Sequence, residues 1–147
     1  MLGWLIAAAS ITAVDAERAF ARDAQRLGQW TAFRKYADET AVMFDPHAVW
    51  AQEFLATLKD PPKALCWGPS ESWVSCDGRM AINRGPWTSP AGGKGYFTTV
   101  WVREGKGWQW TYDGNDTLAQ PIALPRKPRI VRANCGGRSE LPQEYRQ

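Results

Sequence analysis

The sequence is short of the side chains that most catalytic and metal sites require. It contains one histidine, His47, and three cysteines with no Cys-x-x-Cys pair. A structural zinc ion needs about four nitrogen, sulfur or oxygen ligands, so we expect no metal site. A single histidine also gives no support for a Ser–His–Asp triad, and no helix start follows the glycines around Lys94 as a phosphate-binding loop would require. We therefore expect no cofactor.

Neither sign of charge is in large excess, since 18 Lys and Arg residues stand against 15 Asp and Glu residues. The net charge is only +3, and five basic residues cluster in the stretch between Asp116 and Glu140, which contains no acid. Binding to nucleic acid requires a denser basic surface with exposed aromatic side chains among the charges. We expect a solvated basic tail and no nucleic-acid partner. The basic residues of this stretch are Arg126, Lys127, Arg129, Arg132 and Arg138.

No hydrophobic run is long enough to span a bilayer, which takes about 20 residues. We expect no integral membrane segment, because the apolar stretch at residues 2–13 is too short. It has the length of the hydrophobic region of a signal peptide and ends in small residues, although no Lys or Arg precedes it. We predict that residues 1–14 are a signal peptide and that the protein is periplasmic or secreted. The alternative is an N-terminal apolar segment packed on a cytoplasmic protein.

Tryptophan, in contrast, is abundant. The chain of 147 residues contains nine tryptophans, within a hydrophobic content of 44% and a charged content of 22%. These values are typical of one soluble globular domain, apart from the tryptophan count. Large aromatic side chains fill a small core or cover the faces of a sheet. They can also line a pocket for an apolar or ring-shaped ligand, and the two roles are compatible.

Three segments have helical periodicity. Residues 15–27, 29–37 and 48–58 each place apolar side chains three or four positions apart on one face. Gly28 separates the first two helices, and Asp60 with the two prolines after it ends the third. The side chains expected to face inward are Phe20, Ala24 and Leu27, then Trp30, Phe33 and Ala37, then Trp50, Phe54 and Leu58.

The remainder of the chain favours strands and turns. β-branched and aromatic residues are dense there, and Asp77-Gly78 is a strong hairpin signal. Helices followed by strands indicate the α+β class. Several prolines predict an extended, basic tail at residues 117–147. The expected strands are 40–44 before a turn at Asp45-Pro46, 64–76 with a kink at Gly68-Pro69, 79–87, 95–103 and 107–113.

Several short motifs between residues 16 and 116 resemble the NTF2-like superfamily, also described as SnoaL-like or as a cystatin-like cone. This resemblance implies an α+β cone over residues 15–116, in which three N-terminal helices pack on a curved antiparallel β-sheet. It also implies an interior pocket and a homodimer through the outer face of the sheet. The similar proteins are small, often exported and of undefined role. The motifs are Ala16-Glu17-Arg18-Ala19-Phe20, Trp30-Thr31-Ala32-Phe33, Ala41-Val42-Met43-Phe44, Trp73-Val74-Ser75-Cys76-Asp77-Gly78 and Tyr96-Phe97-Thr98-Thr99-Val100-Trp101.

The preferred functional hypothesis is that the cone binds a small apolar or aromatic ligand, or that the protein serves in assembly through its sheet face. Aromatic side chains of the helical faces and one face of the strand around Tyr96 should meet across the cone. We predict one concavity with Asp45 and His47 at its mouth. The predicted ligand-binding residues are Trp30, Phe33, Tyr36, Trp50, Tyr96 and Thr98.

The alternative is a cofactor-independent lyase, dehydratase or isomerase that uses Asp45 and His47 as acid and base. In ketosteroid-isomerase-like members of the superfamily, an Asp-Pro after the second helix supplies the base, and Asp45-Pro46 falls at that place. The matching oxyanion donors are missing, because Phe20 has no hydroxyl and Thr98 or Thr99 is a weak substitute. Near relatives also end the last strand with an Asp-His-Gly sequence, whereas this chain has no histidine after Asp113.

The three cysteines predict one disulfide and one free thiol. Cys66 and Cys76 should lie at opposite ends of one long strand, beyond the separation that a disulfide allows. We therefore predict a Cys76–Cys135 bridge that holds the tail against the sheet and leaves Cys66 free.

Overall fold

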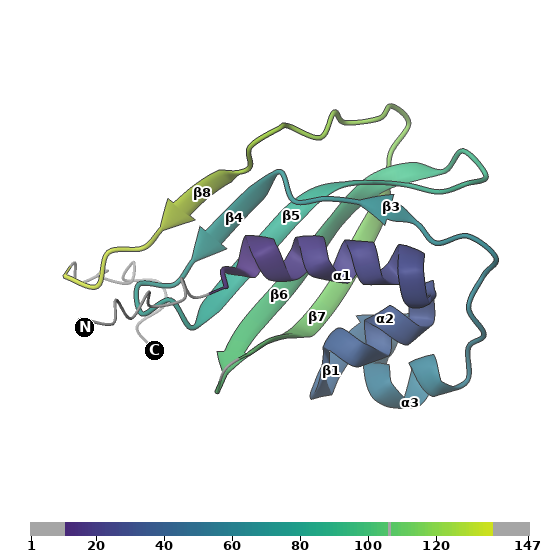
Figure 1. Cartoon of the computed structure of the whole chain (residues 1–147), viewed down its shortest axis with the longest axis horizontal. Coiled ribbons are helices and arrows are strands. Elements are labelled where there is room, and N and C mark those ends of the chain that lie inside the picture. The colour runs from purple at the N-terminus through teal and green to yellow at the C-terminus, as the bar shows by residue number, and fades with distance from the viewer. Residues whose placement is uncertain (1–10, 106, 137–147) are drawn as a thin grey trace, which may run out of the picture.

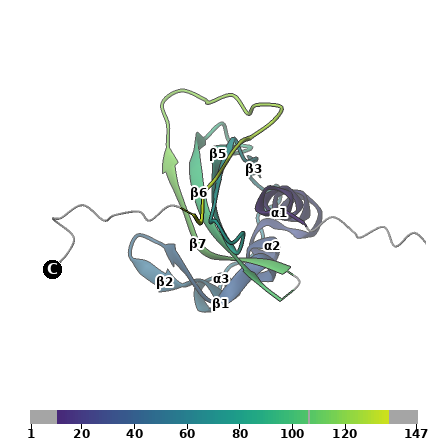
Figure 2. The ribbon, with the colours of Figure 1, turned by 90° about the vertical axis from the view of Figure 1, so that its left-hand side faces the viewer.

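Three helices lie on one side of a single curved sheet (Figures 1 and 2). The computed structural model describes residues 11–105 and 107–136. The helices are α1 (Ala13–Leu27), α2 (Gln29–Tyr36) and α3 (Ala51–Ala56). None of the helices in this part of the chain is long and apolar enough to cross a membrane.

The sheet is mixed, so the prediction of an antiparallel sheet is only partly right. Its strand order is β2-β1-β7-β6-β5-β4-β8, and β3 pairs with β5 outside this path. Strand β1 runs parallel to its neighbour β7, and β4 runs parallel to its neighbour β8. Both parallel pairs join segments that are distant in sequence, which a hairpin cannot do. The strands are β1 (Ala37–Phe44), β2 (Ala48–Trp50), β3 (Cys66–Trp67), β4 (Glu71–Val74), β5 (Met80–Thr88), β6 (Lys94–Glu104), β7 (Gly107–Thr117) and β8 (Arg129–Arg132).

Helix α1 begins two residues earlier than predicted, because Thr12 caps it. The Thr12 side chain accepts a hydrogen bond from the Asp15 backbone, and the Asp15 side chain accepts one from the Thr12 backbone. Ala13 and Val14 are buried in the core. Residues 1–10 of the predicted signal peptide lie outside the described residues, so its removal stays a prediction.

The third predicted helix is partly wrong. Its first three residues form β2, which pairs with β1 as a hairpin around the predicted turn at Asp45-Pro46. The helix that follows buries Ala51 and Leu55, while Trp50 is 56% exposed. Pairing of Val49 and Trp50 with β1 takes their backbone out of the helix and shifts the buried face by one residue.

The predicted long strand 64–76 is divided into β3 and β4. The chain between them passes close over β5, where a Cβ at Gly85 would collide with the Gly68 carbonyl oxygen. The predicted hairpin turn at Asp77-Gly78 is present, with Gly78 at a φ of 72°.

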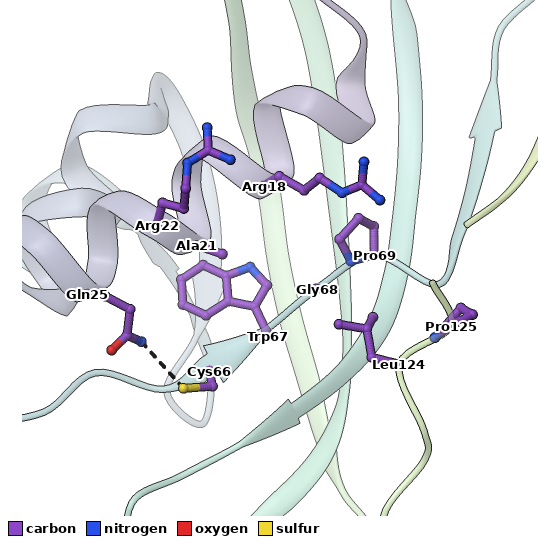
Figure 3. Close-up of a pocket in the computed structure, with 10 residues that line it drawn as sticks. All are labelled: Arg18, Ala21, Arg22, Gln25, Cys66, Trp67, Gly68, Pro69, Leu124 and Pro125. Carbon is purple, nitrogen blue, oxygen red and sulfur yellow. Dashed lines mark hydrogen bonds between the residues drawn. The ribbon is translucent and has the colours of Figure 1, made fainter. Parts of the chain in front are cut away.

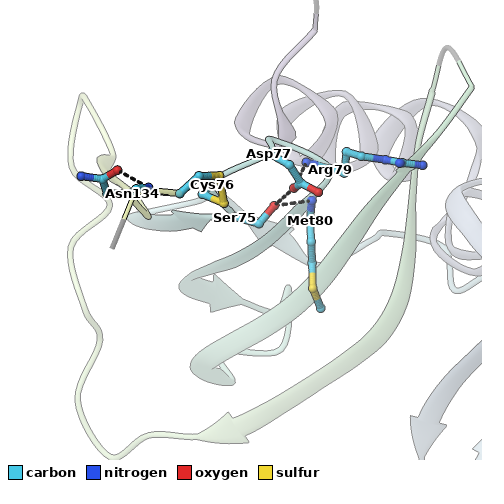
Figure 4. The surroundings of a disulfide bond; sticks show 8 residues. Ser75, Cys76, Asp77, Arg79, Met80 and Asn134 are labelled. Carbon is cyan, nitrogen blue, oxygen red and sulfur yellow. Dashed lines mark hydrogen bonds between the residues drawn. A yellow bond between two sulfur atoms is a disulfide. The ribbon is translucent and has the colours of Figure 1, made fainter. Parts of the chain in front are cut away.

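The C-terminal tail is more ordered than an extended tail, since it supplies β8 at the edge of the sheet. Residues 129–132 pair in parallel with β4. Cys76 and Cys135 form the predicted disulfide with a Cα–Cα distance of 5.0 Å (Figure 4), and Cys66 is free and exposed.

The core lies between the helices and the sheet and is built around Phe20 of α1. Its ring makes edge contacts with Phe33 and Trp67, each at a centroid distance of 4.8 Å. Trp101 and Trp110, which are paired on β6 and β7, are fully buried beneath it. Most of the tryptophan content thus serves the core and its margins, as expected for large aromatic side chains in a small domain.

Candidate functional site

The predicted site residues do not border one concavity, so this prediction is wrong. Trp30 and Phe33 of α2 do line a cavity between the helices and the sheet. Tyr36, at the end of the same helix, lies against Phe20 instead and donates a hydrogen bond from its hydroxyl to Asp23 at 2.9 Å. Its burial raises the pKa of Tyr36 to about 12, so the hydroxyl stays protonated.

Tyr96 and Thr98 lie on the other side of the sheet. In β6 the buried residues Phe97, Thr99 and Trp101 alternate with more exposed ones, and side chains of successive strand residues point to opposite faces. The odd-numbered residues face the helices. Tyr96 therefore lies on the far face, where the Arg84 guanidinium is 4.7 Å from the centre of its ring.

Asp45, His47 and Trp50 lie on the β1–β2 hairpin and are exposed. The Asp45 N–H donates to the His47 carbonyl at 2.9 Å, which closes the turn. None of the three lines the cavity that contains Trp30 and Phe33. A catalytic role for Asp45 and His47 stays a prediction, and the enclosed site that such chemistry favours is elsewhere.

The cavity itself has a volume of about 80 Å³ and aromatic walls. Helix α2, β1, the β3 region and strands β5 to β7 all contribute to it, so it occupies the interior of the cone. Its polar groups are the Asp113 carboxyl and the Asn115 amide on β7. The lining residues are Trp30, Phe33, Met43, Leu65, Trp67, Trp87, Phe97, Asp113 and Asn115.

Asp113 reaches the cavity because β7 contains an irregularity. Trp101 pairs with Trp110 whereas Val100 pairs with Tyr112, so one extra residue, Thr111, interrupts the ladder. Beyond this bulge the odd-numbered residues of β7 share the side that Trp110 occupies before it. Asp113 therefore faces the helices opposite Thr99.

The Asp113 carboxyl has a raised pKa. The Thr99 hydroxyl donates a hydrogen bond to it at 2.9 Å, which favours the charged form. Removal from water by the surrounding walls outweighs this bond and raises the pKa of Asp113 to about 7, with a smaller contribution from the negative charge of Glu17. Near neutral pH this carboxyl can act as either a donor or an acceptor.

Glu17, which is completely buried below the cavity wall, is a second carboxyl with a raised pKa. Its oxygens accept hydrogen bonds from the indole of Trp67 at 2.9 Å, the indole of Trp101 at 2.6 Å and the amide of Asn83 at 3.2 Å. Burial nevertheless raises the pKa of Glu17 to about 7. Through Trp67, which lines the cavity, this carboxyl positions one aromatic wall.

Sequence reasoning missed both carboxyls, although each left a signal. Glu17 stands three positions before Phe20 on the apolar face of α1, where an unpaired acid is unusual. Asp113 lies in a strand rich in aromatic residues, but its inward orientation depends on the bulge at Thr111, which simple alternation does not reveal.

A larger groove lies outside the cone, between α1, the segment around Trp67 and the tail (Figure 3). Its volume is about 330 Å³. Trp67 separates it from the interior cavity and lines both. In the described part of the chain, no three His, Cys, Asp or Glu side chains lie close enough together to hold a metal ion.

Comparison with known proteins identifies the fold. No protein-family model and no curated protein sequence matches this chain. Among solved structures, an NTF-2-like protein of unknown function from Shewanella oneidensis has a TM-score of 0.55 at 18% identity, over 68% of this chain and 93% of that one. A candidate ketosteroid isomerase from Parabacteroides distasonis has a TM-score of 0.57 at 13% identity, over 74% and 89%.

A third similar structure is the CaMKII hub homology domain of Chlamydomonas reinhardtii, with a TM-score of 0.52 at 17% identity over 70% of this chain and 93% of that one. These likenesses show that the chain has the NTF2-like fold. This fold carries enzymes, binding proteins and assembly domains, so the function must be argued from the sites.

Proposed function

We propose that this protein of NTF2-like fold binds a small, flat, largely apolar molecule with one hydroxyl or carbonyl group in the interior cavity. The observation that carries the proposal is the pairing of aromatic walls with one carboxyl, Asp113, whose pKa is raised to about 7. Ligand sites typically combine apolar walls with a few placed polar groups. A single carboxyl that can donate or accept would orient such a ligand.

The size of the cavity limits the ligand. Pockets for drug-sized molecules measure about 300–1,000 Å³, whereas this one measures about 80 Å³. It accepts one end of a single ring, and the rest of the molecule would pass the exposed Asn115 at the mouth. The Trp87 side chain forms part of the cavity wall. Its indole nitrogen is buried and has no hydrogen-bond partner among the described residues.

The proposal is tested with p-cresol and toluene, which differ only in the hydroxyl. Titration followed by tryptophan fluorescence should show tighter binding of p-cresol to the wild-type protein. In Asp113→Leu we expect this preference to fall by about tenfold, because a hydrogen bond to a charged or strongly polar partner is worth about 1.5–3 kcal/mol. Asp116→Asn on the same strand is the control, since its side chain is exposed and outside the cavity. An unchanged preference in Asp113→Leu would contradict the proposal.

A second candidate function is assembly through the far face of the sheet. Residues paired across the strands form one continuous, mainly apolar row on that face, and cross-strand partners point to the same side. Ile82 and Trp50 within it are 37% and 56% exposed. The row is Val131, Trp73, Ile82, Val100, Tyr112, Val42 and Trp50. A second copy of the chain would cover it.

Light scattering after size exclusion tests this dimer. We expect the wild-type protein to be a dimer at about 50 µM, and Ile82→Glu to be a monomer because burial of a new charge disfavours the interface. Ile122→Glu is the matched control, since Ile122 is an exposed isoleucine in the tail. A monomeric wild-type protein at this concentration would exclude the dimer.

The disulfide supports a periplasmic or secreted location, because such bonds persist in oxidising compartments. Peptide mapping without reduction, on protein from its native host, should show the Cys76–Cys135 link and a free Cys66. Three free thiols would instead indicate a cytoplasmic protein.

A further inference from the structure

The groove outside the cone has the features of a second binding site, independent of the interior cavity. We infer that it binds an amphipathic organic anion, with an aromatic or branched apolar body and one carboxylate or sulfonate group. The cationic side is formed by Arg18 and Arg22 of α1, and the apolar side by Trp67, Pro69 and Leu124 (Figure 3).

The two arginines are free to take an external anion. They lie one helical turn apart, are exposed, and have no carboxylate within ion-pair distance in the described part of the chain. Arg26, one turn further on, is already paired with Asp23 at 3.1 Å. Asp15, the nearest exposed acid before them on the helix, is engaged by Thr12, whose hydroxyl donates to it at 2.9 Å. A guanidinium group can donate two parallel hydrogen bonds to a pair of oxygens on a carboxylate or sulfonate.

The apolar side of the groove is formed where the tail lies against the β3–β4 connection. A Cβ at Gly68 would lie 2.7 Å from a methyl carbon of Leu124, so glycine at this position lets the Leu124 side chain lie directly against the backbone. The segment that carries Leu124 is anchored at its two ends, because the Leu118 N–H donates to the Lys94 carbonyl at 2.9 Å and β8 pairs with β4. The other walls of the groove, around Arg18 and Trp67, lie in α1 and β3, which reduces the ordering cost of binding.

The size of the groove fits a small organic molecule. Its volume of about 330 Å³ falls within the range of small-molecule sites. Trp67 presents an aromatic surface to it while its indole N–H is held by Glu17 at 2.9 Å, so the ring is fixed. A flat apolar body can stack there while its acidic group reaches the arginines.

Cys66 provides a direct reporter of occupancy. It lines the groove, is exposed, and is the one cysteine of the three that is not in the disulfide. A ligand in the groove will therefore slow the reaction of this thiol with a neutral reagent such as 4,4′-dithiodipyridine. In that reaction the thiolate attacks one sulfur of the reagent, a mixed disulfide forms, and the other half leaves as pyridine thiolate.

The experiment uses 1-anilinonaphthalene-8-sulfonate, an aromatic sulfonate, as the probe. We expect saturable binding by fluorescence, and protection of Cys66 with the same midpoint concentration. The double variant Arg18→Gln/Arg22→Gln should bind the probe at least about tenfold more weakly, because charge-assisted hydrogen bonds are lost. Arg26→Gln removes the same type of charge from the same helix outside the groove and should change the midpoint less than about twofold.

Three results would overturn the inference. The first is no saturable binding of the probe up to 1 mM. The second is binding that leaves the reaction rate of Cys66 unchanged, which places the probe elsewhere. The third is equal weakening by Arg18→Gln/Arg22→Gln and Arg26→Gln, which would show a general charge effect. Asp113→Leu should leave the midpoint unchanged, so that failure of this site and failure of the interior cavity are distinguishable.

Discussion

At the scale of the single residue, Glu17 is the most unusual side chain in the molecule. It is completely buried in the core, and its three hydrogen-bond donors come from β3, β5 and β6. No cation neutralises it among the described residues. A buried carboxyl of this kind makes stability depend on pH.

The raised pKa values of Glu17 and Asp113 predict that the protein becomes less stable as the pH rises from about 4.5 to 7. Below this window the Glu17 carboxyl is neutral in both states. Within it the unfolded chain ionises first, so the native state binds more protons and rising pH favours unfolding. For Glu17 the loss between pH 5 and pH 8 should be about 2 kcal/mol. Urea unfolding at both pH values measures it.

Glu17→Gln is the matching variant, because it keeps the shape of the neutral carboxyl and cannot ionise. We expect its free energy of unfolding to change with pH by about 2 kcal/mol less than that of the wild-type protein. Asp113→Asn should remove a separate part of the dependence. The same pH profile in wild-type and Glu17→Gln proteins would contradict the assignment.

At the scale of the element, helix α2 determines the position of two cavity walls, Trp30 and Phe33, yet it has no side-chain cap of its own. Gly28 stands at its N-cap, with a φ of 110°. Asp60, from the segment after α3, supplies the cap instead. Its carboxylate accepts hydrogen bonds from the backbone of Trp30 and from the backbone of Thr31 at 3.0 Å.

Asp60→Ala should therefore loosen α2. We expect a loss of about 1 kcal/mol in the free energy of unfolding, the usual cost of removing an N-cap. The Trp30 and Thr31 amides should also exchange hydrogen faster. Asp45→Ala is the control, since Asp45 is an exposed acid to which no helix is anchored. Equal stability of the Asp60→Ala, Asp45→Ala and wild-type proteins would show that the cap is dispensable.

At the scale of the whole molecule, the tail joins the domain through the disulfide and one short edge strand. All four residues of β8 are exposed, so its pairing with β4 buries little apolar surface. The Cys76–Cys135 bond has a sequence separation of 59 residues and includes β5, β6 and β7 in its loop. It connects the tail covalently to the most extensively paired part of the sheet.

Cys135→Ser should lower the free energy of unfolding by about 4 kcal/mol in the chain-entropy model, because a loop of this length restricts the unfolded chain. The amides of Arg129 and Ala133, which donate to the carbonyls of Ser70 just before β4 and of Val74 at its end, should lose protection from hydrogen exchange. Cys66→Ser removes the free thiol and should have no such effect. Similar stability of both variants would show that β8 holds the tail without the bond.

Much of the architecture was predictable from local sequence. Periodicity and turn residues predicted helices at 15–27 and 29–37, a turn at Asp77-Gly78 and strands at 95–103 and 107–113, and all of them are present with somewhat different ends. The motifs also indicated the NTF2-like fold, which the structural comparisons support. The helices, the turn and the strands depend on neighbours in the chain, so the sequence alone determines them.

Only the tertiary structure decided which side chains share the cavity. Either face of β6 was compatible with its alternation, and packing of Phe97 and Trp101 against the helices selected the odd-numbered face. The extra residue at Thr111 then turned Asp113 inward. Trp50 moved to the far face because its backbone pairs with β1 rather than continuing a helix. Each outcome depends on contacts between segments far apart in sequence, and local patterns carry no information about such contacts.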